Sequence, residues 1–87
     1  NQINNIEALK VLKIAQNLDS KDANILYHLG RAFSRLGKIG EAALATAQRY
    51  ALQGDIKNAI LQAKRAEAIL PRGSATWQTT QDIIYGF

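Results

Sequence analysis

The chain has 87 residues, of which 47% are hydrophobic and 21% are charged, and its formal net charge is +4. That length fits one small domain, and the composition is globular rather than disordered. Cysteine is absent, which excludes disulfides, thiol chemistry and cysteine-ligated metal sites. No apolar run approaches the roughly 18 residues that a membrane-spanning helix needs, and no signal-peptide pattern opens the chain.

The sequence begins Asn-Gln-Ile and contains no methionine. We therefore expect residues 1–87 to form a single helical domain that is an excised, C-terminal segment of a longer protein. A targeting signal or a catalytic domain would then lie outside this segment.

Apolar residues recur at helical spacing from the first residues onward, and no segment alternates as a strand would. The first predicted helix, roughly 4–17, begins with a capping-box pattern of Asn4 and Glu7. The second, roughly 23–36, follows Asp22 as N-cap and ends at Gly37, which tolerates the left-handed conformation. The predicted apolar stripes are Ala8, Val11, Leu12 and Ala15 in the first helix, and Leu26, Leu29, Gly30 and Phe33 in the second, widened by Ile25, Ala32 and Leu36.

Three more helices follow. One spans roughly 40–52 and ends at Gly54, and the next spans roughly 56–70 between an Asp55 N-cap and Pro71, since the residue before a proline avoids the helical region. The last begins after a Ser74 cap. Their predicted stripes are Ala43, Ala47, Tyr50 and Ala51; Ile56, Ala59, Ile60, Ala63, Ala66 and Leu70; and Trp77, Thr80, Ile83 and Ile84. About five helices with short links predict an all-α fold.

Aromatic, glycine and small residues recur along the chain with a fixed spacing. The pattern aromatic-x3-Gly-x4-Ala that begins at Phe33 recurs at Tyr50, 17 residues later (50 − 33). Ala8 and Ala42, each early in its helix, are 34 residues apart (42 − 8), and 34 is the period of the tetratricopeptide repeat. The positions that resemble this repeat are Gly30, Phe33, Gly37, Ala42, Ala47, Tyr50, Gly54, Ala59, Ala66 and Pro71.

The resemblance implies antiparallel helix hairpins stacked in a right-handed solenoid. Small residues would let neighbouring helices approach, glycines would make the turns, and proline would close a unit. The two repeat-like patterns overlap on the third helix, so the sequence does not decide which helices line the inner side of the solenoid. The second helix is the preferred inner helix, and the third is its competitor. A generic helical bundle is the alternative fold.

The second half carries a closer resemblance. Residues 71–84 read Pro-x-Gly-Ser-x-x-Trp-x-x-x-x-Asp-Ile-Ile, a run outside the general repeat consensus. This half resembles the C-terminal tetratricopeptide region of bacterial periplasmic zinc metallopeptidases related to the β-barrel assembly-enhancing protease. The resemblance implies a periplasmic protein whose separate N-terminal domain holds zinc through HExxH. Residues 1–87 contain no such motif, so we expect this segment to be non-catalytic and to bind no cofactor.

One face of the second helix is polar. Steps of three and four residues bring its members together, and in a tetratricopeptide array they would line a groove that positions a substrate or an assembly partner. The two arginines would then hold carboxylates, and a merely solvated face is the alternative. The candidate groove residues are Asn24, Tyr27, His28, Arg31 and Arg35.

Catalytic and metal-binding patterns are missing. His28 is the only histidine, and no HxxxH, HxxE or CxxC spacing accompanies it. The seven acidic residues are scattered, and the serines lack the context of an activated nucleophile.

The basic balance, with a pI near 9.7, admits nucleic-acid binding as a rival function. Its basic residues are spread over four helices and interleaved with acids, and we expect Tyr50 and Trp77 to be packing residues rather than a stacking platform. A protein or peptide is therefore the expected partner and nucleic acid is not. Self-association into a homo-oligomer through exposed end helices is the alternative.

Overall fold

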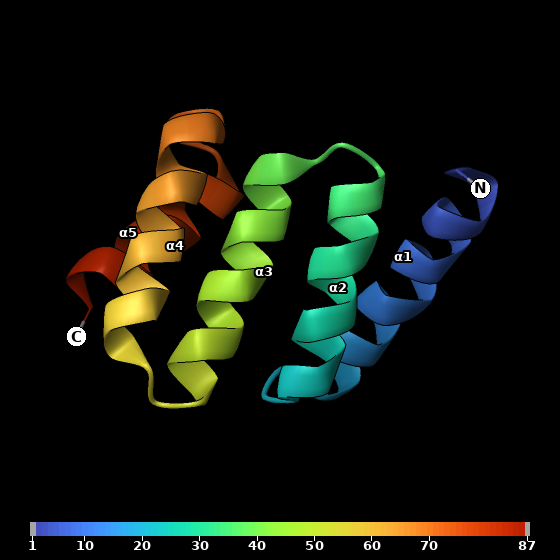
Figure 1. Cartoon of the computed structure of the whole chain (residues 1–87), viewed down its shortest axis with the longest axis horizontal. Helices are drawn as coiled ribbons and strands as arrows, with labels where there is room; N and C mark the ends of the chain where they lie inside the picture. The colour runs from blue at the N-terminus through green and yellow to red at the C-terminus, as the bar shows by residue number, and fades with distance from the viewer. Residues whose placement is uncertain (1, 87) are drawn as a thin grey trace.

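The computed structural model describes residues 2–86. Over that range the chain forms α-helices and no strand, which confirms the all-α class. Figure 1 shows consecutive helices running in alternate directions, joined by short connections. The helices are α1 (Gln2–Leu18), α2 (Ala23–Arg35), α3 (Ile39–Leu52), α4 (Ile56–Ile69) and α5 (Ala75–Tyr85).

Three of the helix starts are capped by the side chains that the sequence predicts. The Asp22 carboxylate accepts hydrogen bonds from the backbone N–H groups of Asn24 and Ile25. Asp55 accepts from Asn58 N at 3.3 Å, and Ser74 Oγ accepts from Trp77 N at 3.2 Å. Each cap satisfies a backbone donor that has no partner inside its own helix.

The repeated aromatic-x3-Gly pattern is a repeated helix end. Gly37 has φ +75° and Gly54 has φ +78°, the left-handed conformation that glycine adopts without steric cost. The residue after each glycine donates a backbone hydrogen bond of 2.9 Å to the aromatic carbonyl five residues earlier, Lys38 to Phe33 and Asp55 to Tyr50. This is the Schellman arrangement, so the 17-residue spacing has a local structural meaning.

The predicted start of the first helix is wrong. α1 already includes Gln2, so Asn4 and Glu7 lie inside the helix and not at a capping box. Glu7 instead forms an ion pair with Lys10, 3.5 Å between Oε1 and Nζ. Three residues apart on a helix, these side chains are neighbours on its surface.

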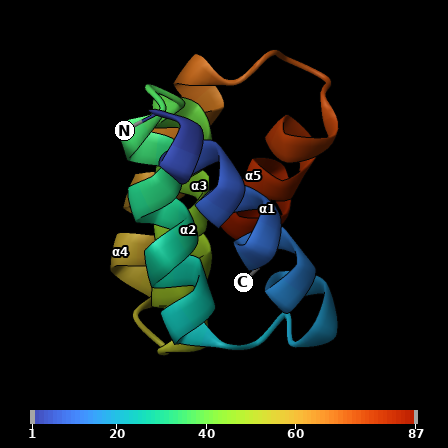
Figure 2. The ribbon, with the colours of Figure 1, turned by 90° about the vertical axis from the view of Figure 1, so that its right-hand side faces the viewer.

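The helices form two layers. α2, α3 and α4 lie side by side in one layer (Figure 1), and α1 and α5 lie on the same side of it (Figure 2). α3 contacts α2, α4 and α5, whereas α1 contacts α2 alone. The opposite side of the layer is covered by no helix within residues 2–86, and it stays open to solvent.

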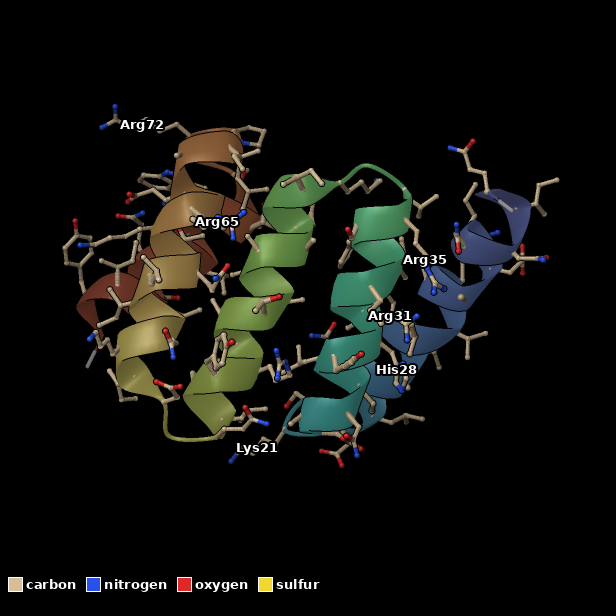
Figure 3. All side chains as sticks on the ribbon, viewed as in Figure 1. Lys21, His28, Arg31, Arg35, Arg65 and Arg72 are labelled. Atoms are coloured by element: carbon tan, nitrogen blue, oxygen red, sulfur yellow. The ribbon has the colours of Figure 1, made fainter. Side chains whose placement is uncertain are left out.

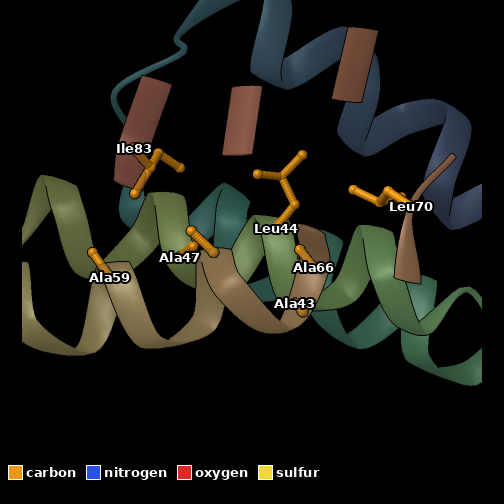
Figure 4. Close-up of a cluster of buried hydrophobic side chains, with 8 residues drawn as sticks. Ala43, Leu44, Ala47, Ala59, Ala66, Leu70 and Ile83 are labelled. Carbon is orange, nitrogen blue, oxygen red and sulfur yellow. The ribbon is translucent and has the colours of Figure 1, made fainter. Parts of the chain in front are cut away.

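Small residues hold α3 and α4 together. Ala47, Ala59, Ala63 and Ala66 are completely buried, and side chains this short let two helix backbones approach closely. Leu70 and Ile83 fill the space beside them (Figure 4). The alanine pattern in the sequence is therefore a packing seam. Most residues of the predicted stripes of α3, α4 and α5 face it, whereas Ile56 and Ile60 are half-buried outside this cluster.

A second cluster joins α1, α2 and α3 through Leu9, Leu26, Leu29, Ala32 and Ala45. Here the predicted stripe of the first helix is partly wrong, because Ala8 and Val11 are exposed and Leu9 is buried. α1 packs on one neighbour only, so only a narrow strip around Leu9 and Leu12 is covered. The large apolar side chains of Ile3, Ile6, Val11, Ile14 and Leu18 are exposed.

Candidate functional site

The five residues predicted on the second helix are all exposed, but they do not form one site. His28, Arg31 and Arg35 line a groove of about 450 Å³ against α1, where Glu7 lies on the other wall. Figure 3 shows these three side chains following one another along α2. Tyr27 lies on the α3 side of α2, and Asn24 is not among the residues that line this groove. Of the five, only Arg31 borders both the groove against α1 and the groove on the α3 side of α2.

A second groove of about 400 Å³ crosses the open side of the layer from α2 over α3 to α4. Its floor contains small side chains of α2 and α3, among them Gly30, Ala42 and Ala43. The longer side chains around it are Tyr27, Arg31, Ile39, Arg49, Gln62 and Arg65, and the short Ser34 side chain also borders it. We call this the arginine groove.

Arg31 and Arg49 both contact Tyr27 at one border of the arginine groove, and Tyr50 adjoins Arg49 outside the groove lining. The Arg31 guanidinium lies 5.8 Å from the centre of the Tyr27 ring, and Arg49 lies 5.7 Å from the same centre. Arg49 also lies 4.9 Å from the ring centre of Tyr50. These distances are those of cation–π contacts, so two rings orient Arg49 and two guanidinium groups share Tyr27. The His28 ring is 5.4 Å from Tyr27.

No carboxylate lines the arginine groove. Within residues 2–86 the only ion pair is the one between Lys10 and Glu7, so Arg31, Arg49 and Arg65 have no charge partner there. Arg65 donates one hydrogen bond, 3.2 Å, to the neutral Gln62 side chain. The carboxylates of Asp22 and Asp55 are used as helix caps instead. The groove is therefore cationic.

The other side of the layer has a different groove, of about 530 Å³, between α1 and α5. Lys13 and Gln16 contribute from α1, Glu41 and Gln48 from α3, and Thr79 from α5. Positive and negative side chains both line it, so it has no single electrostatic preference. We call this the α1–α5 groove.

The described part of the chain contains no group of three His, Cys, Asp or Glu side chains that could hold a metal ion. Within it, too, no buried side-chain nitrogen or oxygen lacks a hydrogen-bond partner. None of the helices in residues 2–86 combines the length and apolarity needed to cross a membrane.

Two residues of the arginine groove, Tyr27 and Arg31, belong to the predicted set, and Arg49 and Arg65 do not. Arg49 and Arg65 come from α3 and α4, and the predicted groove residues include none from these helices, although the third helix was the competing inner helix. One signal was available: in an antiparallel hairpin, residues at similar distances from the turn lie opposite each other. Tyr27 and Arg49 flank Gly37 in this way, ten residues before it and twelve after (37 − 27 and 49 − 37).

The fold and its grooves define an all-α helical-hairpin protein with a cationic groove on one side. Comparisons of the sequence and structure with protein-family models, curated proteins and solved structures give no significant match.

Proposed function

We propose that this chain is a non-catalytic protein-interaction module that docks an extended peptide segment of a partner in the arginine groove. The observation that carries the proposal is the groove itself, which crosses three consecutive helices on the side that no other helix of residues 2–86 covers. Its floor of small residues leaves room for a peptide backbone. Because packed helices preform the groove, binding costs little ordering entropy.

The proposal includes a tetratricopeptide-like architecture. Two features support it: the identical Schellman ends 17 residues apart, at Phe33–Lys38 and Tyr50–Asp55, and the alanine seam between α3 and α4. The contact of α3 with α5, with none between α2 and α4, favours a register in which the third helix is the inner one. In that register the α1–α5 groove is the competing docking surface.

Peptide selection with two groove-filling variants tests the proposal and separates the two surfaces. Ser34 is exposed and borders the arginine groove, and Thr76 is exposed and borders the α1–α5 groove. A random peptide library displayed on phage is selected against the whole chain, and selected peptides are titrated against each variant. We expect Ser34→Trp to weaken binding at least tenfold and Thr76→Trp to change it less than twofold. The reverse pattern, or no selected peptide, would contradict the proposal.

A second candidate function, self-association, is favoured by the outward side of α1. Ile3, Val11, Ile14 and Leu18 are 72%, 64%, 62% and 85% exposed. Apolar side chains in such a row are typical of a protein contact. Sedimentation equilibrium of the chain and of the double variant Val11→Lys with Ile14→Lys tests this. A concentration-dependent dimer that the variant abolishes would support self-association, and a monomer at all concentrations would exclude it.

We also propose that the chain is the C-terminal region of a bacterial periplasmic zinc metallopeptidase, where the module would position a substrate or an assembly partner. The support is the resemblance of residues 71–84, which adopt a defined turn: Gly73 has φ +84° and Ser74 caps α5. Sequencing the gene upstream of Asn1 tests it. An HExxH motif and a signal peptide are expected, and a reading frame that contains neither contradicts the assignment.

A further inference from the structure

The geometry points to an acidic peptide as the ligand of the arginine groove, with Arg49 as the central binding residue and Arg31 and Arg65 as its flanking partners. This inference rests on the proposed function and deepens it, because it names the chemistry of the docked segment. It also assigns Arg49 and Arg65, which lie outside the predicted groove residues, to the site.

Two aromatic rings restrict the orientation of Arg49. Its guanidinium lies over both the Tyr27 and the Tyr50 ring, at 5.7 and 4.9 Å from their centres. A guanidinium that stacks on an aromatic face keeps the N–H groups at its edge free for a carboxylate. Since the rings already restrict the side chain, less conformational entropy is lost when a ligand binds.

The charge of the arginine groove is positive. Arg31, Arg49 and Arg65 come from three successive helices, and no carboxylate borders the groove. Lining one groove with like charges and no counter-charge is unfavourable in the free protein, and an anionic ligand relieves it. Arg–carboxylate pairs are also short, charge-assisted and often bidentate.

The width of the three-helix layer sets the length of the ligand. Packed helices lie ~8–10 Å apart, so the path from α2 to α4 is ~16–20 Å. An extended chain covers ~3.4 Å per residue, which gives about five or six residues. In an extended peptide alternate side chains point the same way, so acidic residues at every second position would all face the groove.

A charged peptide is preferred here to nucleic acid. Binding of a single strand by stacking requires ring faces that are free for bases. The two rings at this site are instead in contact with Arg31, Arg49 and His28. Tyr27 therefore has two guanidinium groups over its ring, and Tyr50 has one.

The experiment uses a fluorescein-labelled alternating Glu-Ala hexapeptide and a matched Gln-Ala hexapeptide, titrated by anisotropy against the whole chain at moderate salt. We expect the acidic peptide to bind at least tenfold more tightly. Arg49→Gln should weaken its binding at least fivefold. Arg65→Gln, at an exposed position, should also weaken binding of the acidic peptide at least fivefold, and it replaces Arg49→Gln as the test if that variant does not fold. Lys64→Gln is the matched control, because Lys64 is exposed, lies outside the groove and carries the same charge.

Tyr27→Leu separates orientation from charge. It keeps every arginine but removes the ring that Arg31 and Arg49 share, and it should weaken the acidic peptide at least threefold while the melting temperature stays within a few degrees. An unchanged affinity would remove the tyrosine from the site and overturn the proposed role of the rings.

Three further results would overturn the inference. They are equal affinity for the two peptides, an equal loss in Lys64→Gln and Arg49→Gln, and tighter binding of a single-stranded oligonucleotide of the same charge. Failure of the inference is distinguishable from failure of the proposed function. Neutral library peptides that are blocked by Ser34→Trp but not by Arg49→Gln would refute the acidic ligand and leave the docking groove intact.

Discussion

Gly40 and Leu70 lie in direct contact across the α3–α4 pair. A Cβ atom added to Gly40 would lie 2.9 Å from Leu70 Cδ2 and 3.1 Å from Ile69 Cγ2. A larger residue at position 40 would therefore collide with Leu70, which is part of the α3–α4 core.

Gly40→Ala should therefore destabilise the fold. Overpacking a filled site costs about 1–3 kcal/mol, which exceeds the helix propensity gain of up to about 1 kcal/mol. We expect a net loss of about 1 kcal/mol in the free energy of unfolding, measured by urea denaturation. Gly30→Ala is the matched control, since a Cβ there would meet its neighbours at 3.6–3.9 Å. It should stabilise by about 0.5–1 kcal/mol, and a shift of the same sign in both variants would contradict this explanation.

Ala63→Leu should be severely destabilising, because Ala63 is completely buried in the seam between α3 and α4. The larger side chain forces the two helices apart, at a cost of about 1–3 kcal/mol or more. Ala68→Leu places the same side chain at an exposed position of the same helix and should shift the midpoint of thermal unfolding little. Tolerance of leucine at both positions would show that α3 and α4 are not closely packed.

Asp55→Ala should cost about 1 kcal/mol of stability, as loss of an N-cap typically does. The carboxylate accepts from the backbone and side-chain nitrogens of Asn58, at 3.3 and 2.8 Å. Asp82→Ala removes an exposed acid near the end of α5, where a negative charge meets the negative end of the helix dipole. Its stability should stay equal or rise slightly. Chemical denaturation of both variants compares the two acids at equal change in net charge.

α1 should be the least protected helix in hydrogen exchange. It contacts α2 alone, and Leu9 is its one buried residue, so its opening exposes little apolar surface. We expect backbone amides of residues 6–18 to exchange faster than those of α3 under native conditions. Leu9→Ala should accelerate exchange in α1 and leave the α3–α4 amides unchanged. Equal protection of α1 and α3 would mean that the chain unfolds only as one unit.

The sequence by itself determined the all-α class, the helix ends and most of the buried faces. Asp22, Asp55 and Ser74 cap helices, and Gly37 and Gly54 end them, because caps and turns depend on residues only a few positions apart. The alanine stripes identified the α3–α4 seam for the same reason, since helical periodicity is local. The predicted start of α1 was wrong. Its predicted stripe was partly wrong because the exposure of Val11 depends on which helices cover α1.

Only the tertiary structure decided which polar side chains share a surface. Tyr27 and Arg31 were predicted as groove residues, yet Arg49 and Arg65, which border the same groove, come from α3 and α4, where no groove residue was predicted. Their convergence depends on the crossing of α2, α3 and α4 and on the side of that layer that α1 and α5 leave open. Such long-range packing follows from how whole helix faces fit together, and no local spacing in the sequence specifies it.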